Sequence, residues 1–136
     1  MIPAKGEKLN ITSSSDNMRL VERLVEDVCD VFNVNEDSYG NILIAVTEAV
    51  NNAIYHGNQG NPEKKIKIGF ESGDKNICFS VADEGAGFDH ASLPDPTDPI
   101  NIDKPNGRGV FLMKNLADKV EFNNNGQEVC LTFNVN

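Results

Sequence analysis

The sequence predicts a single α/β-type domain in which helices come first and a mostly antiparallel sheet follows. In the first part of the chain, apolar residues recur at three- and four-residue steps, as they do on the buried side of an amphipathic helix. Later segments alternate between apolar and polar residues and are separated by short turns rich in Gly and Asn, which is typical of hairpins. The length of 136 residues matches about one domain, which we expect over residues 1–136.

Each element has its own local signal. Ser and Asn clusters precede the first two expected helices, and Gly57 is expected to end the second helix in a left-handed conformation. Turns at residues 73–75 and 124–126 predict two hairpins. The expected strands cover residues 8–12, 64–72, 76–82, 119–123 and 128–136, and the expected helices cover about 18–32, 39–56 and 109–118.

Composition excludes several classes of protein. Twelve Lys and Arg against 21 Asp and Glu give a net charge of −9, which argues against binding to nucleic acid or to an anionic membrane surface. No apolar stretch has the length of a spanning helix or of a signal-peptide core, so we expect a cytoplasmic protein. Cys29, Cys78 and Cys130 are expected to be buried structural thiols, and with two His residues a His/Cys zinc site is not expected.

The second expected helix carries a first candidate motif, Glu48 and Asn52. At about 100° per residue these side chains lie one turn apart on one side of the helix, beside the small residues Ala45 and Ala49. A Glu carboxylate can act as a general base, and an Asn carbonyl oxygen suits Mg²⁺. The alternative is that both are ordinary residues of the helix surface.

A second candidate motif ends the strand at residues 76–82. Strand alternation puts Asp83 on the apolar face, where a carboxylate needs a partner, and an adenine amine would be a suitable donor. Gly85 and Gly87 follow, and they allow a ligand to approach the backbone closely. The alternative is a turn that ends the strand, with Asp83 as its cap.

The third candidate motif is Gly107-Arg108-Gly109, which we expect just before the last helix. Backbone N–H groups at the start of a helix bind anionic oxygens, and Arg108 would add a charge-assisted contact to a phosphate. The alternative is a flexible loop that meets a helix. Before this motif, residues 88–106 hold four of the six prolines and show no periodicity, which is typical of a functional or disordered loop.

Taken in order, the three motifs resemble the N, G1 and G2 boxes of the GHKL ATP-binding domains, found in DNA gyrase and sensor histidine kinases. The segment from Thr47 to Gly57 is similar to the N-box of bacterial anti-sigma-factor serine/threonine kinases. The resemblance covers nearly the whole chain. It implies a two-layer α/β sandwich, the Bergerat fold, with helices packed on one face of a mixed, mostly antiparallel sheet.

The resemblance also implies a function and roles for the motif residues. Glu48 would be the catalytic residue that polarises the acceptor hydroxyl or a water, and Asn52 would coordinate Mg²⁺. Asp83 would bind the adenine amine of ATP, with Gly85 and Gly87 shaping the pocket. The phosphates would be lined by Gly107, Arg108 and Gly109, and residues 88–106 would form the ATP lid. Members often place a Thr soon after the Gly of the last hairpin, whereas here Gly126 is followed by Gln127 and Glu128.

Two functions therefore remain in view. The first is an ATP-dependent serine/threonine protein kinase that phosphorylates a small anti-anti-sigma (STAS-like) protein and also binds a sigma factor, with a homodimer as one arrangement. The second is a non-catalytic nucleotide-binding module that sequesters a sigma factor or another signalling partner. Retention of both Glu48 and Asn52 favours the kinase, because binding alone needs neither residue.

Overall fold

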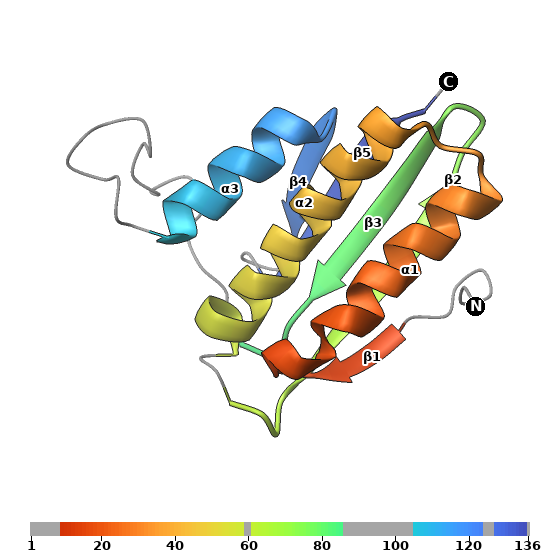
Figure 1. The fold of residues 1–136 in the computed structure, drawn as a ribbon. Helices are drawn as coiled ribbons and strands as arrows, with labels where there is room; N and C mark the ends of the chain where they lie inside the picture. Colours follow the sequence, from red (N-terminus) through yellow and green to blue (C-terminus); the bar gives the residue numbers. More distant parts are fainter. Residues whose placement is uncertain (1–8, 59–60, 86–104, 124–126, 136) are drawn as a thin grey trace.

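The computed structural model describes residues 9–58, 61–85, 105–123 and 127–135. Five strands form one sheet in the order β1-β2-β3-β5-β4, and the helices α1, α2 and α3 lie together on one of its faces (Figure 1). The strands are β1 (Leu9–Thr12), β2 (Lys65–Ser72), β3 (Asn76–Ala82), β4 (Lys119–Asn123) and β5 (Glu128–Asn134). The helices are α1 (Met18–Val31), α2 (Glu36–Asn52) and α3 (Pro105–Leu116). The two-layer α/β architecture is thus confirmed.

Every pairing among the described strands is antiparallel, so the parallel pair that a mixed sheet would contain does not occur in this part of the chain. The core lies between the sheet and the helices, because alternate residues of β2, β3 and β5 point to the helix layer. Its largest fully buried side chains include Phe79, Ile42, Ile54, Ile66, Ile68, Ile77, Met113 and Leu131. No helix among the described residues combines the length and hydropathy needed to cross a bilayer.

α2 begins one turn earlier than the periodicity predicted. Asn35 is its N-cap, and the Asn35 side-chain oxygen accepts a hydrogen bond of 2.8 Å from the backbone N–H of Ser38. Glu36 and Asp37 then occupy the first turn, where negative charge is favoured by the helix dipole. Polar residues at the start of a helix hide it from a search for apolar spacing, which explains the error.

The end of α2 also differs from the prediction. The helix widens into a π-helical segment, Ala53–Gly57, in which the N–H of Asn58 donates to the carbonyl of Ala53 at 2.8 Å. Gly57 therefore lies inside this segment and does not end the helix with a positive φ. The expected left-handed cap is wrong, and another reason for a glycine at this position follows from its neighbours, described below.

α3 starts at Pro105, so its predicted start near Gly109 is also wrong. Proline suits the first position of a helix, because its fixed φ is helical and it lacks an N–H that would have no partner there. Gly107, Arg108 and Gly109 thus belong to the first two turns of α3 and do not precede it. Most of the expected lid, residues 88–104, lies outside the described residues, as does Gly87.

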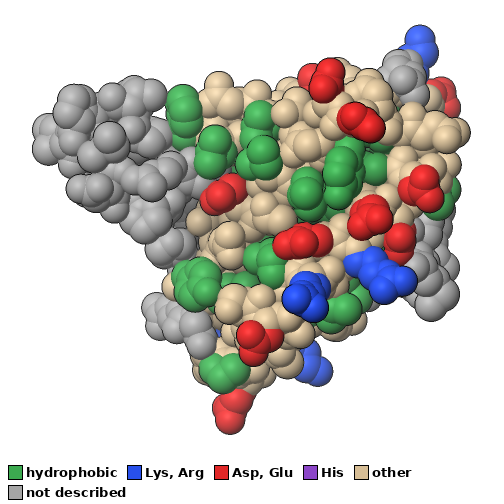
Figure 2. Space-filling model, viewed as in Figure 1, with side chains coloured by type: hydrophobic (Ala, Val, Ile, Leu, Met, Phe, Trp, Pro, Cys, Tyr) green, Lys and Arg blue, Asp and Glu red, His purple; other side chains and the backbone are tan. Residues whose placement is uncertain are grey.

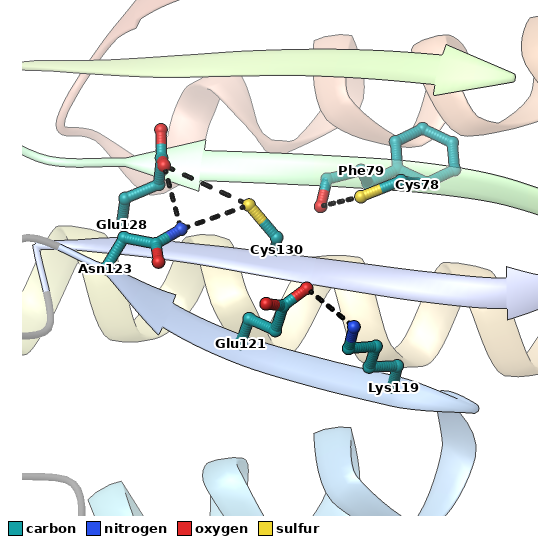
Figure 3. Close-up of polar contacts among 7 residues, drawn as sticks. All are labelled: Cys78, Phe79, Lys119, Glu121, Asn123, Glu128 and Cys130. Carbon is teal, nitrogen blue, oxygen red and sulfur yellow. Dashed lines mark hydrogen bonds and ion pairs between the residues drawn. The ribbon is translucent and has the colours of Figure 1, made fainter.

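The cysteines show which sheet face is covered. Cys29 is buried in α1, as expected, but Cys78 and Cys130 are half-buried on the face away from the helices. Their strand neighbours Phe79 and Leu131 take the core positions, so alternation turns both thiols outward (Figure 3). The prediction that these two thiols are buried is therefore wrong: apolar strand segments do not by themselves reveal which residues face the core.

Candidate nucleotide site

A cavity opens between the helix layer and the sheet at the end where α2 and β3 finish. Its space is about 310 Å³, including the part open to solvent. It combines apolar walls with the polar side chains of Asn52, Asp83 and Gln127. The lining residues are Ala49, Asn52, Ala53, Gly57, Val81, Asp83, Met113, Phe122, Gln127 and Val129.

Asp83 follows the last residue of β3 and is half-buried at the cavity. Its carboxylate accepts a hydrogen bond of 2.8 Å from the N–H of Gly85, and its own N–H donates to the carbonyl of Gln127 at 2.9 Å. Burial raises the pKa of Asp83 above its usual value, while the Gly85 N–H and the positive charge of Lys64 oppose this rise. The site thus presents a desolvated acceptor, which suits an amino group of a ligand.

Two glycines let the backbone segments around Asp83 approach closely. A Cβ on Gly57 would overlap the Asp83 carboxylate, and a Cβ on Gly85 would overlap the carbonyl group of Gly57. The π-helical segment and the turn after β3 therefore pack backbone against backbone. This contact explains both glycines: Gly85 lies against the Gly57 backbone, and the approach of a ligand to Gly85 stays a prediction.

Asn58 fixes this corner of the molecule and was not identified from the sequence. It is 1% exposed, and its side-chain oxygen accepts from the N–H of Glu84 at 2.8 Å. Its amide nitrogen donates to the carbonyl of Lys65 at 3.1 Å and to the hydroxyl of Ser13. One buried side chain therefore ties together the segments beside β1, β2 and β3. Its role depends on contacts between segments distant in sequence, which no local pattern reveals.

The N-box residues have different positions relative to the cavity. Asn52 lines it together with Ala49, whereas Ala45, the other member of the predicted strip of small side chains, is buried in the core and does not line the cavity. Glu48 is half-buried one turn earlier on α2 and is not among the lining residues. The structure thus brings Asn52 and Asp83 to one cavity, while Glu48 lies outside its lining, one helical turn before Asn52.

The G2 residues are placed by the backbone of α3. α2 and α3 pack against each other and run in opposite directions, so the start of α3 lies near the end of α2 that carries Asn52 (Figure 1). Gly107, Arg108 and Gly109 belong to these first turns. Because α3 starts at Pro105, the N–H of Gly107 falls in the first turn, has no partner within the helix and can bind an anion, whereas the N–H of Gly109 is used by the carbonyl of Pro105 one turn earlier. Contacts of Arg108 with phosphate stay a prediction.

The donor set fits a nucleotide with its metal better than a metal held by protein alone. Among the described residues, no group of three or more His, Cys, Asp and Glu side chains is placed to hold a metal ion. Asn52 offers one amide oxygen at the cavity. Mg²⁺ is commonly bound by one or two protein oxygens together with substrate phosphates and water, and this arrangement is compatible with such a site.

Comparisons with known proteins agree with this geometry. The family described as "Histidine kinase-like ATPase domain" matches residues 11–133. A protein named serine-protein kinase RsbW, from Oceanobacillus iheyensis, is 30% identical over 129 residues, which cover 90% of this chain and 76% of that protein. The anti-sigma F factor of Bacillus cytotoxicus is 35% identical over 88 residues, which cover 62% of this chain and 59% of that protein.

A solved structure shares the fold. The crystal structure of the RsbU and RsbW domains of Rv1364c from Mycobacterium tuberculosis aligns with a TM-score of 0.60 at 17% identity. The alignment covers 94% of this chain and 32% of that one. The sequence match over residues 11–133 spans both the N-box helix and the last hairpin, so it includes the whole described cavity. The chain belongs to the family of histidine kinase-like ATPase domains.

Proposed function

We propose that this chain is a cytoplasmic, ATP-dependent serine/threonine protein kinase that acts as an anti-sigma-type regulator. The observation that carries the proposal is the cavity that brings Asn52 and Asp83 together at the open end of the two-layer sandwich. The relatives named as serine-protein kinase and anti-sigma F factor support the same function. In this proposal residues 1–136 act as one kinase domain, with residues 88–106 as its lid.

The polar side chains of Asn52 and Asp83 at the cavity support ATP binding. The Asp83 carboxylate accepts from the exocyclic amine of adenine, with Gly85 and Gly87 bordering the base. The phosphates extend toward the start of α3, where Gly107, Arg108 and Gly109 line them, with the free N–H of Gly107 and the positive charge of Arg108 as donors. Asn52 holds Mg²⁺ through its amide oxygen. When bound, Mg²⁺ supplies positive charge that offsets the charge developing on the phosphate oxygens.

Glu48 acts on the protein substrate. It accepts the proton of a Ser or Thr hydroxyl while the hydroxyl oxygen forms a bond to the γ-phosphorus. The bond from that phosphorus to the bridging oxygen breaks, and ADP leaves. Phosphoryl transfer depends mostly on positioning and electrostatics, so a carboxylate one helical turn from Asn52 has a suitable location.

The partner is a protein, for which the helix layer offers a surface. Its outer side exposes several large apolar side chains, and acidic side chains and a few Lys or Arg side chains lie among the apolar ones on this face (Figure 2). The exposed apolar residues are Leu20, Val31, Ile44, Tyr55 and Phe111. We assign as substrate a small anti-anti-sigma (STAS-like) protein, with a sigma factor as the regulated partner and a homodimer as the assembly.

Single-turnover phosphorylation of a STAS-like protein from the same genome tests the catalytic assignment. Glu48→Gln removes the charge and keeps the size, so ATP should still bind while the rate falls by about 10²- to 10⁴-fold. Asn52→Ala should weaken Mg²⁺-dependent ATP binding as well as turnover. Glu71→Gln, exposed on β2 on the sheet face away from the helices, is the matched control and should react at the wild-type rate.

One observation favours the second function, a non-catalytic module that binds nucleotide and sequesters its partner. Glu48 is not among the residues that line the cavity. If wild-type protein binds ATP and partner but transfers no phosphate, this second function holds. A Glu48→Gln protein with the wild-type rate would instead show that Glu48 is a residue of the helix surface.

A further inference from the structure

Gln127 lies beside Asp83, opposite it in the antiparallel pairing of β3 with β5. The β3–β5 ladder pairs Ala82 with Glu128, and the next bond runs from the N–H of Asp83 to the carbonyl of Gln127 at 2.9 Å. The ladder thus continues one step beyond the ends of both strands. This bond fixes the backbone of Asp83 at the cavity.

The side chain of Gln127 holds the turn that follows. Its amide nitrogen donates to the carbonyl of Gly85, and the N–H of Gly85 donates to the Asp83 carboxylate at 2.8 Å. With the backbone bond, these contacts form a closed ring through Asp83, Gly85 and Gln127. Each member is therefore oriented by the other two, and the carboxylate is held at the cavity wall.

The orientation of the Gln127 side-chain amide determines which hydrogen-bonding groups the cavity presents to a nucleobase. A carboxamide has donors on its nitrogen and an acceptor on its oxygen. Because the Gly85 carbonyl accepts, the nitrogen must face it, and a reversed amide would set two acceptors against each other. Gln127 lines the cavity together with Asp83. The acceptor that this end of the cavity presents is thus the Asp83 carboxylate, held in place by the Gly85 turn to which Gln127 donates.

We propose that Gln127 is a positioning residue that gives the site its preference for a purine with an amino group at position 6. The inference rests on the proposed nucleotide site and goes beyond it, because it assigns base selection to a residue outside the three motifs. An adenine amine satisfies the oriented Asp83 carboxylate. A carbonyl at the same place, as in guanine or hypoxanthine, leaves two acceptors facing each other without a proton between them.

Calorimetric titration of ADP, GDP and IDP into the full chain tests the proposal. Wild-type protein should prefer ADP over IDP and GDP by about 10- to 100-fold. Gln127→Met keeps the volume and the backbone bond but removes the carboxamide, so the preference should fall by at least about threefold. Gln127→Glu keeps the shape but removes the donor to Gly85, and it should lower the preference as well. Thr132→Val, on the outer face of β5, is the control.

The outcomes separate this inference from the proposed function. If wild-type protein binds none of the three nucleotides, both the proposed function and the role of Gln127 are contradicted. If wild-type protein prefers ADP and both Gln127 variants weaken all three nucleotides equally, Gln127 is merely structural and the inference alone falls. A ratio of affinities is the decisive readout because a general loosening of the site lowers every affinity and leaves the ratio unchanged. Circular dichroism confirms that each variant is folded.

Discussion

Asp83 is a candidate binding residue whose burial lowers the stability of the folded protein. Its carboxylate is half-buried at the end of an apolar strand face, and burial raises its pKa above the usual value. The raised pKa means that the folded state disfavours the ionised form. Ionised Asp83 therefore destabilises the folded protein near neutral pH. A ligand amine that pairs with this carboxylate would offset the cost, so the position is better suited to binding than to stability.

Asp83→Asn should accordingly raise the melting temperature of the ligand-free protein at pH 7. Below its ordinary pKa, Asp83 is protonated in both the folded and unfolded states, so the cost is absent there. It develops as the pH rises through the raised pKa. The advantage of the Asn variant should thus be largest at neutral pH and vanish toward about pH 4. Thermal melts from pH 4 to 8, with Asp74→Asn at an exposed turn as control, measure it.

The same variant should bind ADP much more weakly, because an amide replaces the charged acceptor with a weaker one that can also turn its donor toward the ligand. Calorimetry at pH 7 measures the affinity. An Asp83→Asn protein that binds ADP as tightly as wild type would contradict the assignment of the adenine amine to Asp83. A lowered melting temperature at neutral pH would contradict the burial cost.

For individual residues, the sequence predicted part of the candidate nucleotide site. Strand alternation and helical spacing are local, so they brought attention to Asp83 and Asn52, which the structure places on one cavity. Gln127 and Gly57 depend on strand register and on a π-helical turn, which local patterns do not contain. The chemical roles of the motif residues remain predictions.

Among the elements, the end of α2 does most to shape the site. The π-helical segment brings Gly57 against Asp83 and Gly85, and Asn58 directly after it joins three segments by hydrogen bonds. Apolar periodicity located the middle of each helix but misplaced the starts of α2 and α3. Those starts depend on Asn35 as a cap and on Pro105 in the first turn, and such residues carry no apolar signal.

Two glycine-to-alanine variants should have opposite effects. At Gly85 a Cβ would overlap the carbonyl of Gly57, so Gly85→Ala should reduce the free energy of unfolding by about 1–3 kcal/mol and weaken ADP binding. At Gly40, inside α2, a Cβ would meet nothing within 4 Å. Gly40→Ala should therefore stabilise the protein by about 0.5–1 kcal/mol through helix propensity, with nucleotide affinity unchanged.

Urea unfolding of the two variants in parallel measures these effects, and calorimetry measures ADP binding. Because both variants add the same methyl group, Gly40→Ala is the matched control for Gly85→Ala. Equal stability of the Gly85→Ala protein and wild type would show that the turn after β3 does not pack closely on the π-helical segment.

For the molecule as a whole, the decisive feature is that α1, α2 and α3 cover the same face of the sheet (Figure 1). The composition and the order of elements predicted an α/β domain, but which face of each strand is covered depends on the complete layer. The opposite face carries polar side chains around Cys78 and Cys130, among them Ser80, Glu121 and Thr132. Asn123 donates to Cys130 Sγ at 3.6 Å, and Lys119 pairs with Glu121 at 3.4 Å (Figure 3).

The three thiols should therefore react with Ellman's reagent in a defined order. Cys78 should be labelled first, because it is half-buried on the uncovered face. Cys130 lies beside it, but burial and the neighbouring Cys78, Glu128 and Glu121 raise its pKa to about 11, so little reactive thiolate forms near neutral pH. Its labelling rate should increase about tenfold per pH unit between pH 7 and 9.

Cys29 is buried on the core side of α1, and burial raises its pKa to about 11, so it should be labelled only as fast as the protein unfolds. Peptide mapping after timed labelling identifies each site, and Cys78→Ser should remove the first phase alone.

Low urea should accelerate the labelling of Cys29 in proportion to the unfolded population while leaving Cys78 nearly unchanged. Labelling of Cys29 as fast as Cys78 would mean that the helices do not cover the core face, and a fully protected Cys78 would mean that the outer face is itself covered.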